Sequence, residues 1–196
     1  MNVDDIVKVL KNEGKVVALK TDTVYGLVCN AYDKIAVDKI YNIKNREKKK
    51  PLALFIGDIK ELEKYIDYKS LNKNTISQLK KYWPGALTVL FKKKDDSFNY
   101  LLNDGDRIGI RIPNDKTLLD ILERVDFPLA ETSCNISGEK EYESASVIRE
   151  KLGKKIDLIV DGGTIGSNIP STIISINRDE IDIIRSGALD IDVQKF

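Results

Sequence analysis

Residues 44–50 hold five cationic side chains directly before Pro51 and an apolar run. Lysine and arginine side chains held close together can bind phosphate or carboxylate oxygens, and arginine does so through two parallel hydrogen bonds. One interpretation is therefore an anion clamp formed by Lys44, Arg46 and Lys50. The alternative is a solvated charge run at a helix C-terminus, where cations also suit the negative end of the helix dipole.

Two further segments carry short polar side chains. Residues 20–27 place hydroxyl groups at alternate positions, so Thr23 and Tyr25 of an extended chain would face one cleft. Residues 133–138, SCNISG, combine hydroxyl, amide and glycine just beyond an expected strand, as a phosphate or carboxylate cradle requires. Taken alone, residues 20–27 also fit a strand end with a polar turn, and residues 133–138 fit an ordinary polar loop better than a cradle.

Residues 107–113 alternate strictly between isoleucine and other residues. On a strand, Arg107, Gly109 and Arg111 would share one face, with the two arginines about 13 Å apart. Gly109 would leave space for a ligand to approach the backbone. The pattern fits a cationic binding face, and it equally fits an edge strand that uses charge against aggregation.

Helices and short strands are expected to alternate along the chain and to position these segments. Hydrophobic spacing predicts helices over residues 6–10, 35–43, 59–65, 74–82, 118–125 and 146–152, the first capped by Asp4 or Asp5. Apolar runs predict strands over residues 16–19, 52–56, 86–91, 107–113, 128–132, 158–160, 173–176 and 181–184, with a turn at 178–179.

The composition limits the class of protein. At 196 residues the chain suits one domain, 1–196, and its 32 basic and 31 acidic residues give a net charge of only +1. The absence of histidine excludes histidine-based acid–base catalysis and zinc sites that need histidine. Two distant cysteines fit a reducing compartment, and no apolar run has the length of a signal peptide or membrane span. We expect a soluble, cytoplasmic protein with no membrane partner.

Taken together, the motifs resemble those of the YrdC family. They comprise TDTVYGL at 21–27, K-x-R and K-P-L within 44–52, WPGALT at 83–88, IRIP at 110–113, SCNISG at 133–138, PST at 170–172, and Arg185. Each motif is weak alone, but seven in this order and spacing are specific. The length is similar to that of the single-domain members.

This resemblance implies both a fold and an activity. The fold would be α/β, with a twisted mixed sheet of parallel and antiparallel strands, mostly parallel at its centre, and flanking helices around a basic cavity. The activity would be threonylcarbamoyl-AMP synthesis from L-threonine, bicarbonate and ATP, with Mg2+ accompanying the ATP and pyrophosphate released. The product would pass to a transferase complex acting on tRNA, and direct contact with tRNA is an open possibility.

The residues combine with the resemblance to give specific roles. Lys44 and Arg46 are the expected catalytic cations. The expected ATP-binding residues are Arg46, Lys50, Ser133 and Asn135 and, by resemblance, Arg107 and Arg185. By resemblance, the threonine-binding residues are Thr23, Arg111 and Ser171. No protein-held metal site is expected.

One departure from the family pattern and two alternative functions remain open. Phe55 stands where some members carry a histidine, which leaves open how the threonine side chain or the carbamate is held. A YciO-type paralogue would share the fold without the synthase activity. A module that binds double-stranded RNA or tRNA would use the local cations, although the near-neutral charge argues against it.

Overall fold

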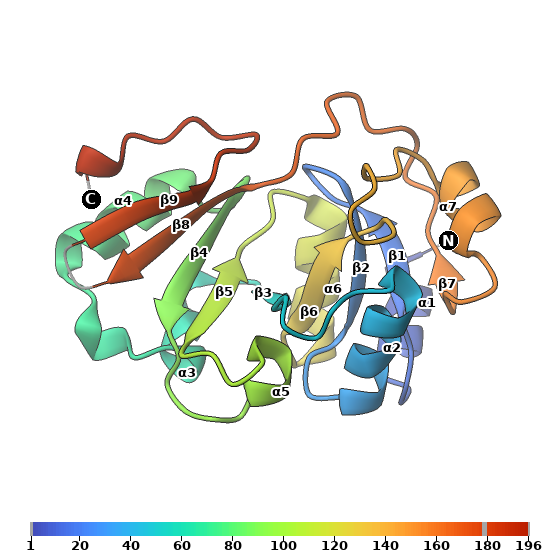
Figure 1. The fold of residues 1–196 in the computed structure, drawn as a ribbon, viewed down its shortest axis with the longest axis horizontal. Helices are drawn as coiled ribbons and strands as arrows, with labels where there is room; N and C mark the ends of the chain where they lie inside the picture. The colour runs from blue at the N-terminus through green and yellow to red at the C-terminus, as the bar shows by residue number, and fades with distance from the viewer. Residues whose placement is uncertain (1, 178–179, 196) are drawn as a thin grey trace.

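The computed structural model describes residues 2–177 and 180–195, which form one mixed sheet with flanking helices (Figure 1). The strands are β1 Val17–Lys20, β2 Tyr25–Asn30, β3 Ala53–Phe55, β4 Leu87–Lys92, β5 Arg107–Arg111, β6 Leu129–Ser133, β7 Leu158–Ile159, β8 Thr172–Asn177 and β9 Glu180–Arg185. The helices are α1 Val3–Leu10, α2 Lys34–Lys44, α3 Leu62–Tyr65, α4 Lys73–Tyr82, α5 Asn99–Leu102, α6 Lys116–Val125 and α7 Ala145–Leu152. Short 3-10 turns occupy Ile59–Glu61, Tyr68–Ser70 and Val193–Lys195.

The elements expected from the sequence are present within a few residues of their predicted bounds. The cap of α1 is Asn2 rather than Asp4 or Asp5, because the Asn2 side chain accepts from Asp5 N while Asp5 reaches back to the Asn2 backbone. Strand β2 was not predicted from the sequence, because polar residues precede it and the whole segment 20–27 was interpreted as polar. The turn expected at 178–179 lies outside the described residues.

The strand order is β7-β1-β2-β6-β3-β5-β4-β8-β9 over the described part of the chain. Three neighbouring pairs are parallel, β1–β7, β3–β5 and β4–β8, and the others are antiparallel. The mixed sheet is thus confirmed, but the mostly parallel centre is wrong, because β3 pairs antiparallel with β6 and β5 pairs antiparallel with β4. A short connection such as that from β1 to β2 allows only antiparallel pairing.

Each face of the sheet packs against its own hydrophobic cluster. Val17 and Leu19 belong to the cluster with α1 and α6, whereas Ala18 between them belongs to the larger cluster with α2 and α7. This alternation is the period of two expected of a strand with both faces covered. Helix α7 lies beside β7 and β1 at one end of the sheet, and α4 lies beside β8 and β9 at the other (Figure 1).

Strand β5 lies between β3 and β4, so the edge-strand interpretation is wrong. The open space expected above Gly109 is also absent, because an added Cβ would lie 3.2 Å from Leu90 Cδ2 and 3.3 Å from Ala53 Cβ. Gly109 therefore serves close packing of three adjacent strands.

Candidate active site

A cavity of about 150 Å³ opens beside β3, β5 and β6. Ala53 of β3 pairs with Glu131 of β6, and both residues line the cavity. Six residues predicted from the sequence line what we call the central cavity: Thr23, Arg46, Arg111, Ser133, Ser171 and Arg185.

Arg111 is held rigidly at the end of β5. Its side chain donates to Asp22 Oδ1 at 2.6 Å, to Thr23 Oγ1 at 2.9 Å and to the Gly85 carbonyl at 3.0 Å. These bonds use three of the five guanidinium N–H groups. The residue is only 2% exposed, so the Asp22 carboxylate compensates a charge that would otherwise be costly to bury.

The loop after β1 supplies the partners of Arg111. Thr21 Oγ1 accepts from the backbone N–H groups of Thr23 and Val24, which closes the turn between β1 and β2. Thr23 Oγ1 is thereby fixed 3.1 Å from Thr21 Oγ1 and against Arg111. Tyr25, expected to share this cleft, instead points into the core, where its hydroxyl bonds the backbone of Gly162 and Gly163.

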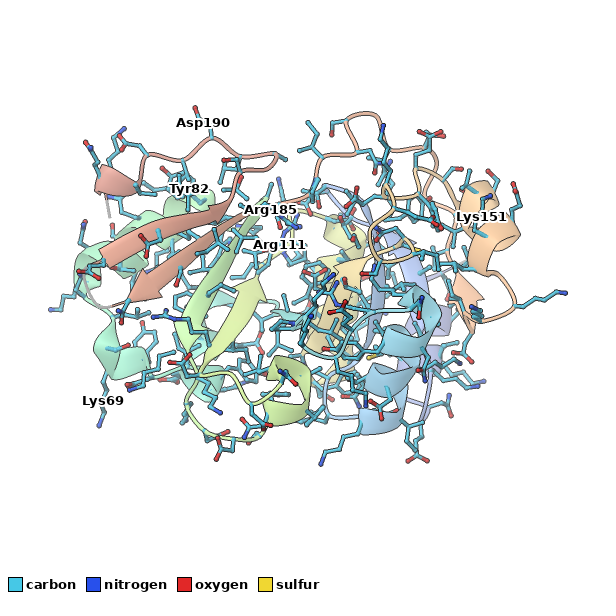
Figure 2. All side chains as sticks on the ribbon, viewed as in Figure 1. Lys69, Tyr82, Arg111, Lys151, Arg185 and Asp190 are labelled. Atoms are coloured by element: carbon cyan, nitrogen blue, oxygen red, sulfur yellow. The ribbon has the colours of Figure 1, made fainter. Side chains whose placement is uncertain are left out.

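The last two strands contribute a second arginine. Arg185, at the end of β9, donates from Nη2 at 2.7 Å and from Nε at 3.2 Å to the carbonyl of Ser171. The Ser171 hydroxyl lies 2.8 Å from Thr88 Oγ1, which ties β8 to β4. Figure 2 shows Arg185 and Arg111 near each other at the middle of the molecule.

Arg46 is the third arginine of the central cavity. It follows α2, and its Nε and Nη2 donate to the carbonyls of Lys50 and Pro51 at 3.0 and 2.9 Å. The loop before β3 thus folds around the guanidinium and fixes it at the cavity wall. The Nη1 atom makes no bond with the described residues, so its two N–H groups are free for a ligand.

Lys44 has a different role from the one expected. The residue is 1% exposed, and its ammonium donates to the Ser133 carbonyl, to the Asn135 carbonyl at 3.0 Å and to Asn135 Oδ1 at 2.7 Å. Three donors with three protein acceptors leave none for a phosphate. Burial, helped by the neighbouring Arg46 charge, lowers the pKa of Lys44 to about 8.

The loop from Ser133 to Asn135 is organised by these bonds. Asn135 Oδ1 also accepts from Ser133 Oγ at 2.8 Å, and Asn135 Nδ2 donates to the Glu139 carbonyl at 2.7 Å. Both polar atoms of the Asn135 side chain are therefore bonded, and the residue is 5% exposed, whereas Ser133 lines the central cavity. The structure makes Lys44 and Asn135 the supports of Ser133.

Two predicted residues lie apart from the central cavity. Lys50 is exposed and does not line the cavity, and its carbonyl accepts from Arg46 and from the Tyr41 hydroxyl. The three-cation clamp is therefore wrong, and Arg46 is its one member at the wall. Arg107 begins β5 at the end opposite Arg111 and donates to the Ile176 carbonyl at 2.8 Å.

The residues that sequence reasoning missed include Asp22, Thr88 and Gly85, which bond predicted site residues, and Glu131, which lines the cavity. Thr88 and Gly85 belong to the WPGALT motif, and Asp22 belongs to TDTVYGL. The motifs therefore contained these residues but did not indicate what each of them does. Glu131 lies two residues before Ser133, and the two-residue period of a strand places both on one face.

Glu131 is the acidic residue of the cavity wall. Its side chain forms no hydrogen bond and no ion pair with any residue in 2–177 or 180–195. Burial raises the pKa of its carboxyl, and the charges of Arg111, Arg185, Lys44 and Arg46 oppose that rise.

Within the described residues, no cluster of three or more histidine, cysteine or acidic side chains could hold a metal ion. Over the same residues, no helix has the length and apolar character needed to cross a bilayer.

Comparison with known proteins shows the relationship of this chain. The Sua5/YciO/YrdC family model, described by the words telomere recombination, matches residues 9–187. A Methanocaldococcus jannaschii protein whose name gives threonylcarbamoyl-AMP synthase as a provisional assignment is 40% identical, covering 95% of this chain and 87% of that protein. The threonylcarbamoyl-AMP synthase of Bacillus subtilis is 35% identical over 92% of this chain, which spans 52% of that longer protein.

Solved structures agree with the sequence relatives. Pyrococcus abyssi Sua5 in complex with L-threonine has a TM-score of 0.88 and 31% identity, covering 95% of this chain and 54% of that one. E. coli YciO has a TM-score of 0.87 and 26% identity, covering 97% and 91%. HypF in a phosphate- and nucleotide-bound form has a TM-score of 0.82 and 29% identity, covering 95% and 29%. From the family match and these relatives, the chain belongs to the Sua5/YciO/YrdC family.

Proposed function

We propose that this protein is a threonylcarbamoyl-AMP synthase, which makes threonylcarbamoyl adenylate and pyrophosphate from L-threonine, bicarbonate and ATP. The observation that carries the proposal is that Arg46, Arg111 and Arg185 line one cavity together with the hydroxyls of Thr23 and Ser171. The names of relatives at up to 40% identity support the same activity.

In this proposal Arg111, Thr23 and Ser171 bind the amino acid. The two N–H groups of Arg111 that have no partner among the described residues would bind the threonine carboxylate, and the fixed hydroxyls would bind its polar groups. The 150 Å³ cavity is below the ~300 Å³ of typical drug-sized sites, so it suits an amino acid and a phosphate group, with the rest of the nucleotide outside.

Arg46 and Arg185 would bind the phosphate oxygens of ATP, and Ser133 would join them by turning its one hydroxyl hydrogen from Asn135 Oδ1 to a phosphate oxygen. The threonine amine attacks carbon dioxide or bicarbonate to give a carbamate, and a carbamate oxygen then displaces pyrophosphate from the α-phosphorus. Neither step needs a covalent protein nucleophile, because orienting the reactants and stabilising negative charge are enough. Guanidinium groups already fixed by backbone carbonyls perform this role without reorganising.

The described residues supply no carboxylate cage for a metal. We therefore propose that Mg2+ enters as the counter-ion of the ATP phosphates, which is how this ion commonly binds nucleotide enzymes. We further propose that the product passes to a transferase complex that acts on tRNA, and that this happens in the cytoplasm. Direct contact with tRNA is not part of the proposal.

The test is pyrophosphate release by the purified protein from ATP, Mg2+ and bicarbonate, with and without L-threonine and with no RNA present. We expect release that depends on threonine and stops when the divalent ion is chelated. Arg46→Ala should lower the rate at least about 100-fold, because removing one hydrogen-bond donor to a developing negative charge commonly slows catalysis that much. Lys48→Ala removes a neighbouring exposed cation paired with Asp38 and should have no effect.

The same assay separates the alternatives. The fold does not distinguish them, because YciO matches this chain as well as Sua5 does. Absence of threonine-dependent release would favour a YciO-type protein without this activity. Tight RNA binding that weakens steeply with salt, again without release, would favour the RNA-binding module.

A further inference from the structure

The Glu131 carboxylate is at the wall of the central cavity without a partner among the described residues. This is unusual, because Arg46, Arg111 and Arg185 line the same small cavity. The bonds of the three guanidiniums go instead to carbonyls, to Thr23, to Ser171 and to Asp22. Glu131 is thus an anion kept available for something that enters.

The charge of Glu131 restricts what that ligand can be. A group carrying only negative charge would be repelled by the carboxylate, whereas a group with a positive end would pair with it. A zwitterionic amino acid has both an anionic end for Arg111 and a cationic end for Glu131. The cavity, which contains both residues, is of about that size.

We propose that Glu131 binds the α-ammonium group of the amino acid substrate and accepts one proton from it. This role rests on the proposed function, because it concerns the threonine of that reaction. The N–H bond breaks and an O–H bond forms on Glu131, which changes from carboxylate to carboxylic acid. The ammonium becomes a neutral amine, whose free lone pair is what carbamate formation requires.

The surroundings of Glu131 suit an acid that exchanges a proton. The cations that face it are Arg111 on β5, Arg185 on β9, Lys44 at the end of α2, and Arg46 just after α2. They favour the carboxylate that must receive the ammonium. Burial acts in the opposite direction and raises the pKa, which brings the group nearer to the pH at which it can hold a proton.

The binding test uses calorimetry with two ligands, L-threonine and 2,3-dihydroxybutanoate, in which a hydroxyl replaces the ammonium. Glu131→Gln should weaken threonine binding at least about 10-fold, since a charge-assisted bond is lost. The same variant should bind the hydroxy acid as well as or better than the unsubstituted protein does. Glu123→Gln, an exposed glutamate on α6, is the matched control and should change neither affinity.

A purely structural role gives a different result. Equal weakening of both ligands, or no weakening of either, would overturn the proposal. Glu131→Ala, measured beside Glu131→Gln with circular dichroism on both, covers the case in which one variant fails to fold. The ratio of the affinities for L-threonine and for 2,3-dihydroxybutanoate is then taken from the variant that folds.

The kinetic test follows the pH dependence of kcat/KM for threonine. The unsubstituted protein should lose activity as the pH falls, because a protonated Glu131 can no longer accept a proton, and Glu131→Gln should lack this acidic limb. Threonine-dependent release with an unchanged limb in Glu131→Gln would refute the role of Glu131 alone. No threonine-dependent release by the unsubstituted protein would refute the proposed function, and the role of Glu131 with it.

Discussion

The ammonium of Lys44 binds Oδ1 of Asn135 at 2.7 Å, so two residues that the sequence assigned to the substrate bind each other. The bond joins the end of α2 to the loop after β6. We infer that Ser133 reaches the cavity wall because Lys44 holds the carbonyls on either side of Cys134. Lys44 and Asn135 would then affect ATP binding indirectly, through the position of Ser133.

This relationship predicts coupling between the two residues. Lys44→Met and Asn135→Ala should each weaken ATP binding, and the double variant should be little worse than either single variant. A coupling free energy of about 1–3 kcal/mol is expected for groups in one buried network. Calorimetric ATP affinities of the four proteins measure it. Simple additivity would mean that the two residues contact ATP separately.

The buried Lys44 also predicts how stability depends on pH. Its pKa falls from 10.5 to about 8 on folding, so between these pH values the unfolded chain binds more protons than the native one. The penalty for burying this charge is therefore present below pH 8 and is relieved as the pH rises toward 10.5. The gain is roughly 3 kcal/mol at 1.4 kcal/mol per pKa unit.

Urea unfolding of the unsubstituted protein and of Lys44→Met, at several pH values from 7 to 10.5, measures this gain. The stability of the unsubstituted protein relative to the variant should rise across the window. A stability difference that does not change with pH would contradict the lowered pKa of Lys44. A difference that falls as the pH rises would mean that folding raises this pKa.

The Arg111–Asp22 pair should be the costliest ion pair to break. Arg111 is 2% exposed, so Asp22→Asn leaves a buried guanidinium without its counter-charge, and we expect a loss of about 3–5 kcal/mol in the free energy of unfolding. Asp120→Asn, which breaks the more exposed pair with Arg124, is the control and should cost under about 1 kcal/mol. Chemical denaturation compares them, and similar losses would refute the distinction.

The two arginines of β5 should differ in function. Arg107→Ala removes a hydrogen bond to the Ile176 carbonyl away from the cavity, so pyrophosphate release should stay within about 2-fold. Arg111→Ala removes a cavity donor and should abolish measurable threonine binding. Calorimetry with threonine and the release assay check both. A strong loss of ATP affinity in Arg107→Ala would restore the nucleotide role that the sequence suggested.

The case of β5 also shows what the sequence could predict. Alternation with isoleucine gave the strand and the face of Arg111 correctly, because it depends only on local geometry. It could not say which end of that face meets the cavity, since this depends on the pairing with β3 and on loops far along the chain. The alternation placed Arg107 on the same face as Arg111, and the resemblance to the family assigned it to the nucleotide.

Lys44 illustrates a second limit. Its type and its place among the five cations of residues 44–50 suggested a clamp for external anions, which is a sound expectation for exposed cations held close together. Two of the three acceptors that occupy it are backbone carbonyls 89 and 91 residues later in the chain, and the third is Oδ1 of Asn135. Carbonyl groups are the same in every residue, so no residue type in the sequence marks them as partners. Only the fold shows that Lys44 is used internally.

The carbonyl of Ser171, which holds Arg185, has a consequence for biosynthesis. The cavity wall includes Thr23 from the first part of the chain and Arg185 from the last strand, with Ser171 between them. A ribosome delivers these segments at different times, and the earlier ones emerge long before β8 and β9. A nascent chain that has already paired β1, β2 and β6 would still lack one wall, so it could not trap substrate before β9 has docked.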